Sequence, residues 1–196
     1  MKITIIRHGE SRGNVARRIQ GKGDYPLTAK GKAQAKKVAT WLSKHDIDLI
    51  YSSPSSRALD TATAIGKATG IPVITDDRLR PIDLGVLEGL PMEGLDPKND
   101  RMWQKVKDMK NTHAHGGESV NDVIKRAEKF VHEITRQHAE QHVCIVTHNM
   151  TKRALVKILL NIPTHELANL RFPNTAVSVF TIANGSVTAI QLNTTV

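Results

Sequence analysis

The stretch Ile3-Thr-Ile-Ile-Arg-His-Gly-Glu10 joins a short apolar run to a polar, charged segment. The run from Ile3 to Ile6 has the composition of a buried strand, so we expect Arg7 and His8 at the carboxyl end of that strand. In an open α/β sheet, ligands bind at the carboxyl ends of the strands. An arginine there neutralises phosphoryl oxygens, and a neutral imidazole supplies the lone pair for attack on phosphorus. These residues alone leave two interpretations open, a phosphoryl-transfer site and an ordinary loop pair.

Two further apolar runs, at residues 48–51 and 143–147, predict two more buried strands. Apolar residues at helical spacing predict an amphipathic helix over residues 27–44, with Thr28 as its N-cap, and a second helix over residues 119–136. Strands that alternate with helices are typical of α/β proteins. The pattern therefore predicts an α/β fold, a three-layer α/β/α sandwich with a mostly parallel sheet.

The C-terminal region indicates strands that run the other way. The β-rich runs 177–182 and 187–192 flank Asn184-Gly185, a pair that favours a hairpin, so we expect antiparallel C-terminal strands. Residues 91–115 are polar and contain two prolines, one glycine and two histidines, which predicts an irregular insertion with a short helix around residues 101–109. Insertions of this kind often cover an active site.

Composition places the chain among ordinary globular proteins. Its 196 residues are 39% hydrophobic and 24% charged, without repeats or a linker-like segment, which predicts one domain over residues 1–196. The net charge of +9 favours an anionic partner, while a content of 4% aromatic residues provides no stacking platform for single-stranded nucleic acid. The expected partner is therefore a small phosphorylated metabolite and not a nucleic acid.

The sequence predicts neither a signal peptide nor a membrane span, because the apolar run before Arg7 is too short for either. The single cysteine, Cys144, excludes an internal disulfide and lies in an apolar run typical of a packed strand. Both features indicate a cytoplasmic protein. The sequence predicts no particular oligomeric state.

A series of motifs follows in a fixed order along most of the chain. The first motif is Arg7-His-Gly-Glu-Ser-Arg-Gly-Asn14. Later motifs include Gln20-Gly21, Tyr51-Ser-Ser-Pro54 with Arg57, Gly116-Gly-Glu-Ser119 and Val146-Thr-His148. The series resembles the histidine phosphatase superfamily, in its phosphoglycerate mutase-like branch.

The resemblance implies a role for each member of a phosphate pocket. His8 matches the family nucleophile, which becomes phosphorylated and is then hydrolysed, while Arg7, Arg57 and His148 match residues that hold the transferring group. Two arginines and a second histidine suit this task, because phosphoryl transfer depends on positioning and charge stabilisation. The resemblance also implies three positions that contact phosphate or the substrate body, namely Asn14, Gln20 and Gly21. The residues alone leave Arg57 open as a solvated helix residue and His148 as a core histidine.

One position departs from the family pattern. In the family, the acid that protonates the leaving oxygen usually follows a Leu-Arg pair, but Leu79-Arg80 is followed here by Pro81, which cannot transfer a proton. Asp83 is the nearest candidate replacement. If residues 80–84 are extended, positions 81 and 83 point to the same side about 6 to 7 Å apart, and Asp83 faces the pocket. Asn149 is a second departure, because glycine is common at that position.

His113 and His115 form a His-x-His pattern that can bind metal, with Glu118 as the only third candidate nearby. With no cysteine close by, we interpret these histidines as part of a solvated loop. The sequence therefore predicts no metal, and no organic cofactor either.

The predicted function is hydrolysis of small phosphomonoesters through a phosphohistidine on His8. A phosphoglycerate mutase is one alternative, although the chain is short beside mutases whose longer insertions retain the intermediate. A non-catalytic phosphate-binding module is another alternative, which Pro81 favours. The intact His8, Arg7, Arg57 and His148 argue against it, because a pure binder would not need the nucleophile beside a second histidine. Sugar phosphates, phosphoglycerates and nucleotides all stay open as substrates.

Overall fold

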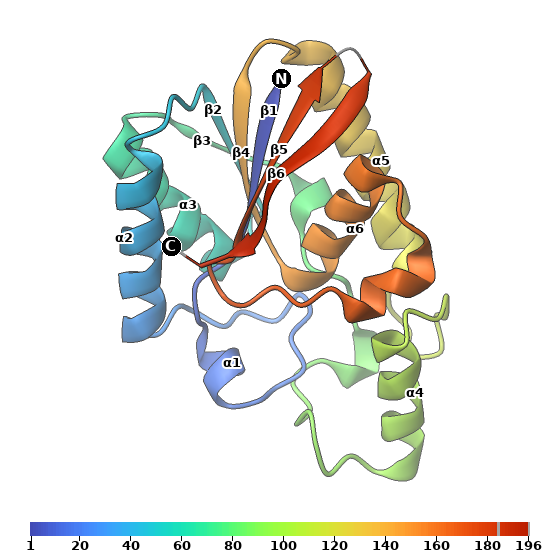
Figure 1. The fold of residues 1–196 in the computed structure, drawn as a ribbon. Helices are drawn as coiled ribbons and strands as arrows, with labels where there is room; N and C mark the ends of the chain where they lie inside the picture. Colours follow the sequence, from blue (N-terminus) through green and yellow to red (C-terminus); the bar gives the residue numbers. More distant parts are fainter. Residues whose placement is uncertain (184, 196) are drawn as a thin grey trace.

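Six strands form one mixed sheet in the computed structural model, which describes residues 1–183 and 185–195 (Figure 1). They are β1 (Lys2–Arg7), β2 (Leu49–Ser52), β3 (Val73–Thr75), β4 (His142–Thr147), β5 (Val177–Ala183) and β6 (Ser186–Thr194). Their order across the sheet is β3-β2-β4-β1-β5-β6. The first four strands are parallel, whereas β5 pairs antiparallel with both β1 and β6. The predicted sheet, mostly parallel with antiparallel C-terminal strands, is confirmed.

Helices cover both faces of the sheet. The α-helices are α1 (Arg12–Val15), α2 (Ala29–Leu42), α3 (Ser56–Thr69), α4 (Pro97–Lys107), α5 (Val120–Gln137) and α6 (Asn149–Leu160), of which α1 and α4 lie beyond the edge of the sheet (Figure 1). Val38 of α2 belongs to one apolar cluster with Ile6, while Phe130 of α5 belongs to a second cluster with Ile5. Adjacent residues of β1 thus serve opposite faces, as the two-residue period of a strand requires. The α2–α3 layer and the α5–α6 layer enclose the sheet, which confirms the predicted three-layer sandwich (Figure 1).

The two helices predicted from apolar periodicity form within about two residues of their expected bounds. Thr28 caps α2, because its Oγ1 accepts a hydrogen bond of 2.9 Å from the Gly31 N–H. Ser119 caps α5 in a capping box with Asp122, each side chain accepting from the other residue's backbone N–H. Both helices therefore begin where a side chain satisfies an exposed backbone donor.

The helix of the insertion begins earlier than predicted. It covers residues 97–107 instead of 101–109, because Asp96 caps it by accepting from the N–H groups of Lys98 (3.0 Å) and Asn99 (3.1 Å). Pro97 occupies the first helical position, where a missing N–H costs nothing and the fixed φ angle suits a helix. The proline marks the start of this helix and not a break before it.

The hairpin prediction is confirmed in its strands, since Ala183 of β5 lies opposite Ser186 of β6. Asn184, on which the predicted turn depends, lies outside the described residues. No helix in the described ranges has both the length and the apolar character needed to cross a bilayer.

Candidate active site

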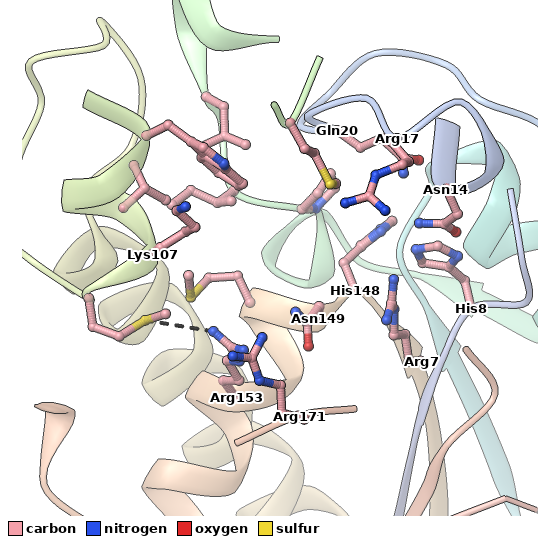
Figure 2. A pocket seen from close by; sticks show the side chains of 18 of the residues that line it. Arg7, His8, Asn14, Arg17, Gln20, Lys107, His148, Asn149, Arg153 and Arg171 are labelled. Carbon is pink, nitrogen blue, oxygen red and sulfur yellow. Dashed lines mark hydrogen bonds between the residues drawn. The ribbon is translucent and has the colours of Figure 1, made fainter. Parts of the chain in front are cut away.

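Two histidines meet at the carboxyl edge of the sheet because their strands are neighbours. β1 and β4 run parallel with Arg7 opposite Thr147, so His8 and His148 follow at the same edge. Their ring centroids are 5.1 Å apart. Together with Arg7 and Arg57, they line a cavity of about 470 Å³ (Figure 2). The structure thus brings together the four residues predicted to form the phosphate pocket.

The imidazole of His8 is held with its lone pair on Nε2. Its Nδ1 lies 2.7 Å from the carbonyl oxygen of Gly9, and since a carbonyl only accepts, Nδ1 carries the ring hydrogen. The backbone of His8 is fixed on both sides. Its N–H donates to the Thr147 carbonyl (3.0 Å), and its carbonyl accepts from the Asn174 side-chain amide (3.0 Å). Nε2 is therefore the ring atom available for attack on phosphorus.

Both histidines are neutral at physiological pH. Burial lowers the pKa of His8 well below its usual range, and the charges of Arg7 and Arg57 lower this pKa further. Burial, followed by the charge of Arg57, also lowers the pKa of His148 well below its usual range. A neutral imidazole keeps the lone pair that nucleophilic attack requires.

The two arginines are anchored through backbone carbonyls. Arg7 donates from Nη1 to the carbonyl of Phe172 (2.6 Å). Arg57 donates from Nη1 to the carbonyl of Gly23 (3.0 Å) and from Nη2 to that of Gly21 (2.9 Å). Burial is the main cause that lowers the pKa of each arginine to about 10, so both stay cationic at neutral pH. Neither guanidinium has a carboxylate partner among the ion pairs of the described residues.

Each of these groups retains a buried nitrogen that finds no hydrogen-bond partner within the described residues. These nitrogens are Arg7 Nε, Arg57 Nε and His148 Nδ1. The other ring nitrogen of His148, Nε2, lies 2.8 Å from Ser53 Oγ, whose hydroxyl can donate to it and leave the ring hydrogen on Nδ1. Buried polar groups without a partner are rare in proteins, and the oxygens of a phosphoryl group would satisfy all three.

The family model described as "Histidine phosphatase superfamily (branch 1)" matches residues 3–195. The chain belongs to this superfamily. It is 33% identical over 198 residues to phosphoserine phosphatase 1 of Hydrogenobacter thermophilus, and the match covers 100% of this chain and 93% of the relative. It is also 34% identical over 180 residues to a probable phosphoglycerate mutase of Yersinia pestis, covering 91% of this chain and 83% of the relative.

A solved structure has the same fold as this histidine phosphatase. The mycobacterial glucosyl-3-phosphoglycerate phosphatase in complex with VO3 superposes with a TM-score of 0.90 at 30% identity, covering 98% of each chain. The predicted resemblance to the superfamily is thereby confirmed over nearly the whole chain.

The three positions predicted to contact the substrate differ in their location in this histidine phosphatase. Asn14 and Gln20 line the cavity, where both side-chain oxygens accept hydrogen bonds from Ser11. Gly21 is not among the lining residues, and its carbonyl accepts from Arg57. A Cβ atom at Gly21 would overlap the carboxylate of Glu88, so a glycine is required there to pack the loop under Arg57.

The structure does not bring Asp83 into the cavity wall. Its Oδ2 pairs with Lys22 Nζ (2.5 Å), and its Oδ1 accepts from the Gly85 N–H (2.9 Å). The hydrogen bond from Lys22 is the main cause that lowers the pKa of Asp83, so the carboxylate is ionised at neutral pH. Residues 80–84 form no strand, whereas Pro81 does line the cavity. Position 81 thus faces the cavity while position 83 does not, and the prediction that Asp83 faces the pocket is wrong.

The sequence did not predict several residues of the site. Asn174, 166 residues after His8, holds the His8 carbonyl and the Asn14 side chain. Ser53 orients His148, and only its place at a strand end hinted at this role. The cavity is also lined by residues from distant segments that no motif marked, and these include Arg17, Glu93, Arg153 and Arg171.

The two histidines of the insertion lie apart from the site. His113 is exposed and pairs with Asp122 (2.6 Å), as expected in a solvated loop. His115 is 1% exposed, with its Nε2 3.2 Å from the Glu118 carbonyl, so the solvated-loop interpretation was wrong for this residue. Its burial follows from the close approach of the Gly85 backbone, where a Cβ would overlap the His115 carbonyl. Within the described residues, no group of three or more His, Cys, Asp or Glu side chains could hold a metal ion.

Acidification below about pH 6.5 should destabilise the protein through its buried histidines. The folded pKa values of His8 and His148 are lowered, whereas histidine in an unfolded chain titrates near pH 6.5. Below that pH the unfolded state binds protons that the folded state does not, so the free energy of unfolding falls by up to about 1.4 kcal/mol per pH unit for each histidine. Urea unfolding at pH 7.5, 6.5 and 5.5 measures this slope. The slope should be shallower in a His8→Asn variant, and an unchanged slope would contradict the assignment.

Proposed function

We propose that this chain hydrolyses small phosphomonoesters through a phosphohistidine intermediate on His8. The observation that carries the proposal is the position of a neutral, anchored imidazole beside unpartnered buried nitrogens of Arg7, Arg57 and His148. Membership of the histidine phosphatase superfamily and the phosphatase names of its relatives support phosphomonoester hydrolysis.

The reaction proceeds in two balanced steps. Nε2 of His8 attacks phosphorus with its lone pair, and the P–O bond to the leaving group breaks with both electrons on the ester oxygen, which then takes a proton from water. Water then attacks the same phosphorus, the P–N bond breaks, and inorganic phosphate leaves with His8 restored. Arg7, Arg57 and His148 stabilise the negative charge that the phosphoryl oxygens carry in both transition states.

Phosphoglycerate mutase activity is the second candidate, because one relative of this chain is named a probable phosphoglycerate mutase. A mutase would pass the phosphoryl group from His8 to another hydroxyl group, whereas a phosphatase passes it to water. The relatives named phosphatases favour transfer to water.

A screen of phosphorylated metabolites, with phosphate release and phosphoglycerate isomerisation followed in parallel, tests this function. We expect phosphate release without isomerisation, and rates that are the same with and without EDTA. Isomerisation that outpaces phosphate release would establish the mutase, and no turnover of any phosphomonoester would support a binding module. A loss of activity in EDTA that divalent metal restores would contradict the proposed chemistry.

A cytoplasmic location and a single domain over residues 1–196 belong to the same proposal. The location rests on the single Cys144, a buried residue of β4 whose pKa burial raises to about 12, so that the thiol is inert.

A further inference from the structure

A second group of cations lines the same cavity, away from His8. Arg153 of α6 is only 7% exposed, and its Nε is buried without a hydrogen-bond partner within the described residues. Among the described residues, the guanidinium of Arg153 makes one polar contact, a long one of 4.0 Å from Nη1 to Met109 Sδ. Arg171, which follows the 3-10 helix Thr164–Asn169, also lines the cavity, and its guanidinium lies beside that of Arg153 in Figure 2.

These two arginines lack a counter-ion of their own. None of the ion pairs in the described residues includes Arg153 or Arg171. Burial, followed by the charge of Arg171, lowers the pKa of Arg153 to about 10. The charge of Arg153 in turn lowers the pKa of Arg7, so the second group is electrostatically coupled to the phosphate pocket. A buried cation without an anion is costly, and a bound anion would offset both its desolvation and the repulsion from its neighbour.

The position of Arg153 relative to the reacting centre follows from α6. His148 is the N-cap of this helix and Arg153 lies five residues later, which places their backbones about 7.5 Å apart along the helix axis. Asn149 lies one turn before Arg153 and lines the cavity between them, with a buried Oδ1 that has no partner within the described residues. Figure 2 shows Asn149 between His148 and Arg153.

The cavity wall near these arginines is largely apolar. Side chains from the insertion and from α6 form this part of the wall, namely Met92, Trp103, Val106, Met109 and Met150. A leaving group that extends from the phosphoryl group at His8 towards Arg153 and Arg171 therefore passes Asn149 and lies against these apolar side chains, with Lys107 as a further cation in the wall. Such a wall suits an aliphatic chain better than a sugar, whose hydroxyl groups need hydrogen-bond partners.

We propose that Arg153 and Arg171 form a second anion site, and that the substrate is a phosphomonoester whose leaving group carries a carboxylate or a second phosphate. The inference rests on the proposed function and adds a substrate class to it. Guanidinium groups bind a carboxylate and a phosphate alike through charge-assisted hydrogen bonds. The experiment below distinguishes between these two anions.

The test compares alkyl phosphates with ω-carboxyalkyl phosphates and α,ω-alkanediol bisphosphates of equal chain length. We expect kcat/KM to be about 10- to 100-fold higher for one anionic series than for the neutral one, as charge-assisted hydrogen bonds imply. A higher kcat/KM for the ω-carboxyalkyl phosphates identifies a carboxylate site, and a higher kcat/KM for the bisphosphates identifies a phosphate site. In an Arg171→Met variant the ratio should fall towards one. Arg136→Met on the surface of α5 removes the same charge away from the cavity and should keep the wild-type ratio.

A second experiment needs no turnover. Calorimetry compares the affinities of ω-carboxyalkyl and ω-phosphonoalkyl phosphonates with those of simple alkylphosphonates. We expect tighter binding of one anionic series in the wild type, weakened in Arg171→Met and in a folded Arg153→Gln variant. Equal binding and equal kcat/KM for the anionic and neutral series would overturn the second site while leaving phosphatase activity intact. A retained preference in binding without hydrolysis of any series would uphold the second site and refute the proposed function.

Discussion

His8→Ala should abolish phosphatase activity, with a loss of at least about a thousandfold, and leave the fold unchanged. The loss is large because the imidazole supplies the lone pair for the covalent step, and the cavity offers no second nucleophile in an equivalent position. The fold should persist because the hydrogen bonds that hold this loop to Thr147 and Asn174 come from the backbone of His8. Initial rates of phosphate release, with circular dichroism and the melting temperature, measure both parts.

The matched control is His165→Ala, which makes the same chemical change at an exposed residue outside the cavity wall. This variant should retain wild-type kinetics. If His8→Ala keeps more than a small fraction of wild-type activity, the nucleophile is a different group.

Pro81→Glu should raise the turnover of alkyl phosphates by about 10²- to 10⁴-fold, the range that a general acid contributes. Without an acid, the barrier depends on how well the ester oxygen leaves unaided, so the wild type should hydrolyse p-nitrophenyl phosphate much faster than alkyl phosphates. The aryl ester needs little protonation, and its rate should change far less in the variant. Rates for both esters in both proteins measure the effect.

The backbone around position 81 supports this substitution. Pro81 lines the cavity, and its carbonyl accepts from Arg126 Nη2 (3.1 Å). The preceding carbonyl, of Arg80, accepts from Thr151 Oγ1 (2.7 Å). Because these bonds hold main-chain atoms, a glutamate at position 81 should project from the same place in the wall.

The carboxylates near the site are poorly suited to act as the missing acid. Glu93 is the only carboxylate among the described residues that line the cavity, and it is paired with Arg17. Asp83 is paired with Lys22 and has a lowered pKa. An Asp83→Asn variant should therefore leave alkyl and aryl rates unchanged. A selective loss on alkyl phosphates would instead identify Asp83 as the acid, and equal wild-type rates on both esters would indicate a proton donor at another position.

The sequence predicted those parts of the site that depend on local pattern. The apolar runs before Arg7 and before His148 predicted two strands, and two parallel strands of one sheet must end at the same edge, which brings His8 and His148 together. Thr28 likewise marked the start of α2 through a contact within three residues, whereas the cap formed by Ser119 was not predicted although the start of its helix was.

Long-range contacts explain what could not be predicted. Lys22 pairs with Asp83 from 61 residues away, so the environment of that carboxylate is set by a loop that no local pattern places beside it. Arg153 lies in α6 and Arg171 in the segment after the 3-10 helix, and only the folded chain brings them to one cavity, where neither has a counter-ion within the described residues. The start of α4 was predicted wrongly for a different reason. Asp96-Pro97 is a local helix-start signal, and the prediction of a helix around residues 101–109 did not use it.

Trapping of the covalent intermediate tests the central claim most directly. Wild-type enzyme is mixed briefly with ³²P-labelled p-nitrophenyl phosphate, whose leaving group needs little protonation, then quenched in alkali and digested, and the labelled peptide is sequenced. We predict acid-labile, alkali-stable label on the peptide that contains His8, formed faster than steady-state turnover and absent from His8→Ala. Hydrolysis at the wild-type rate without label on protein, or label on any residue other than His8, would contradict the account.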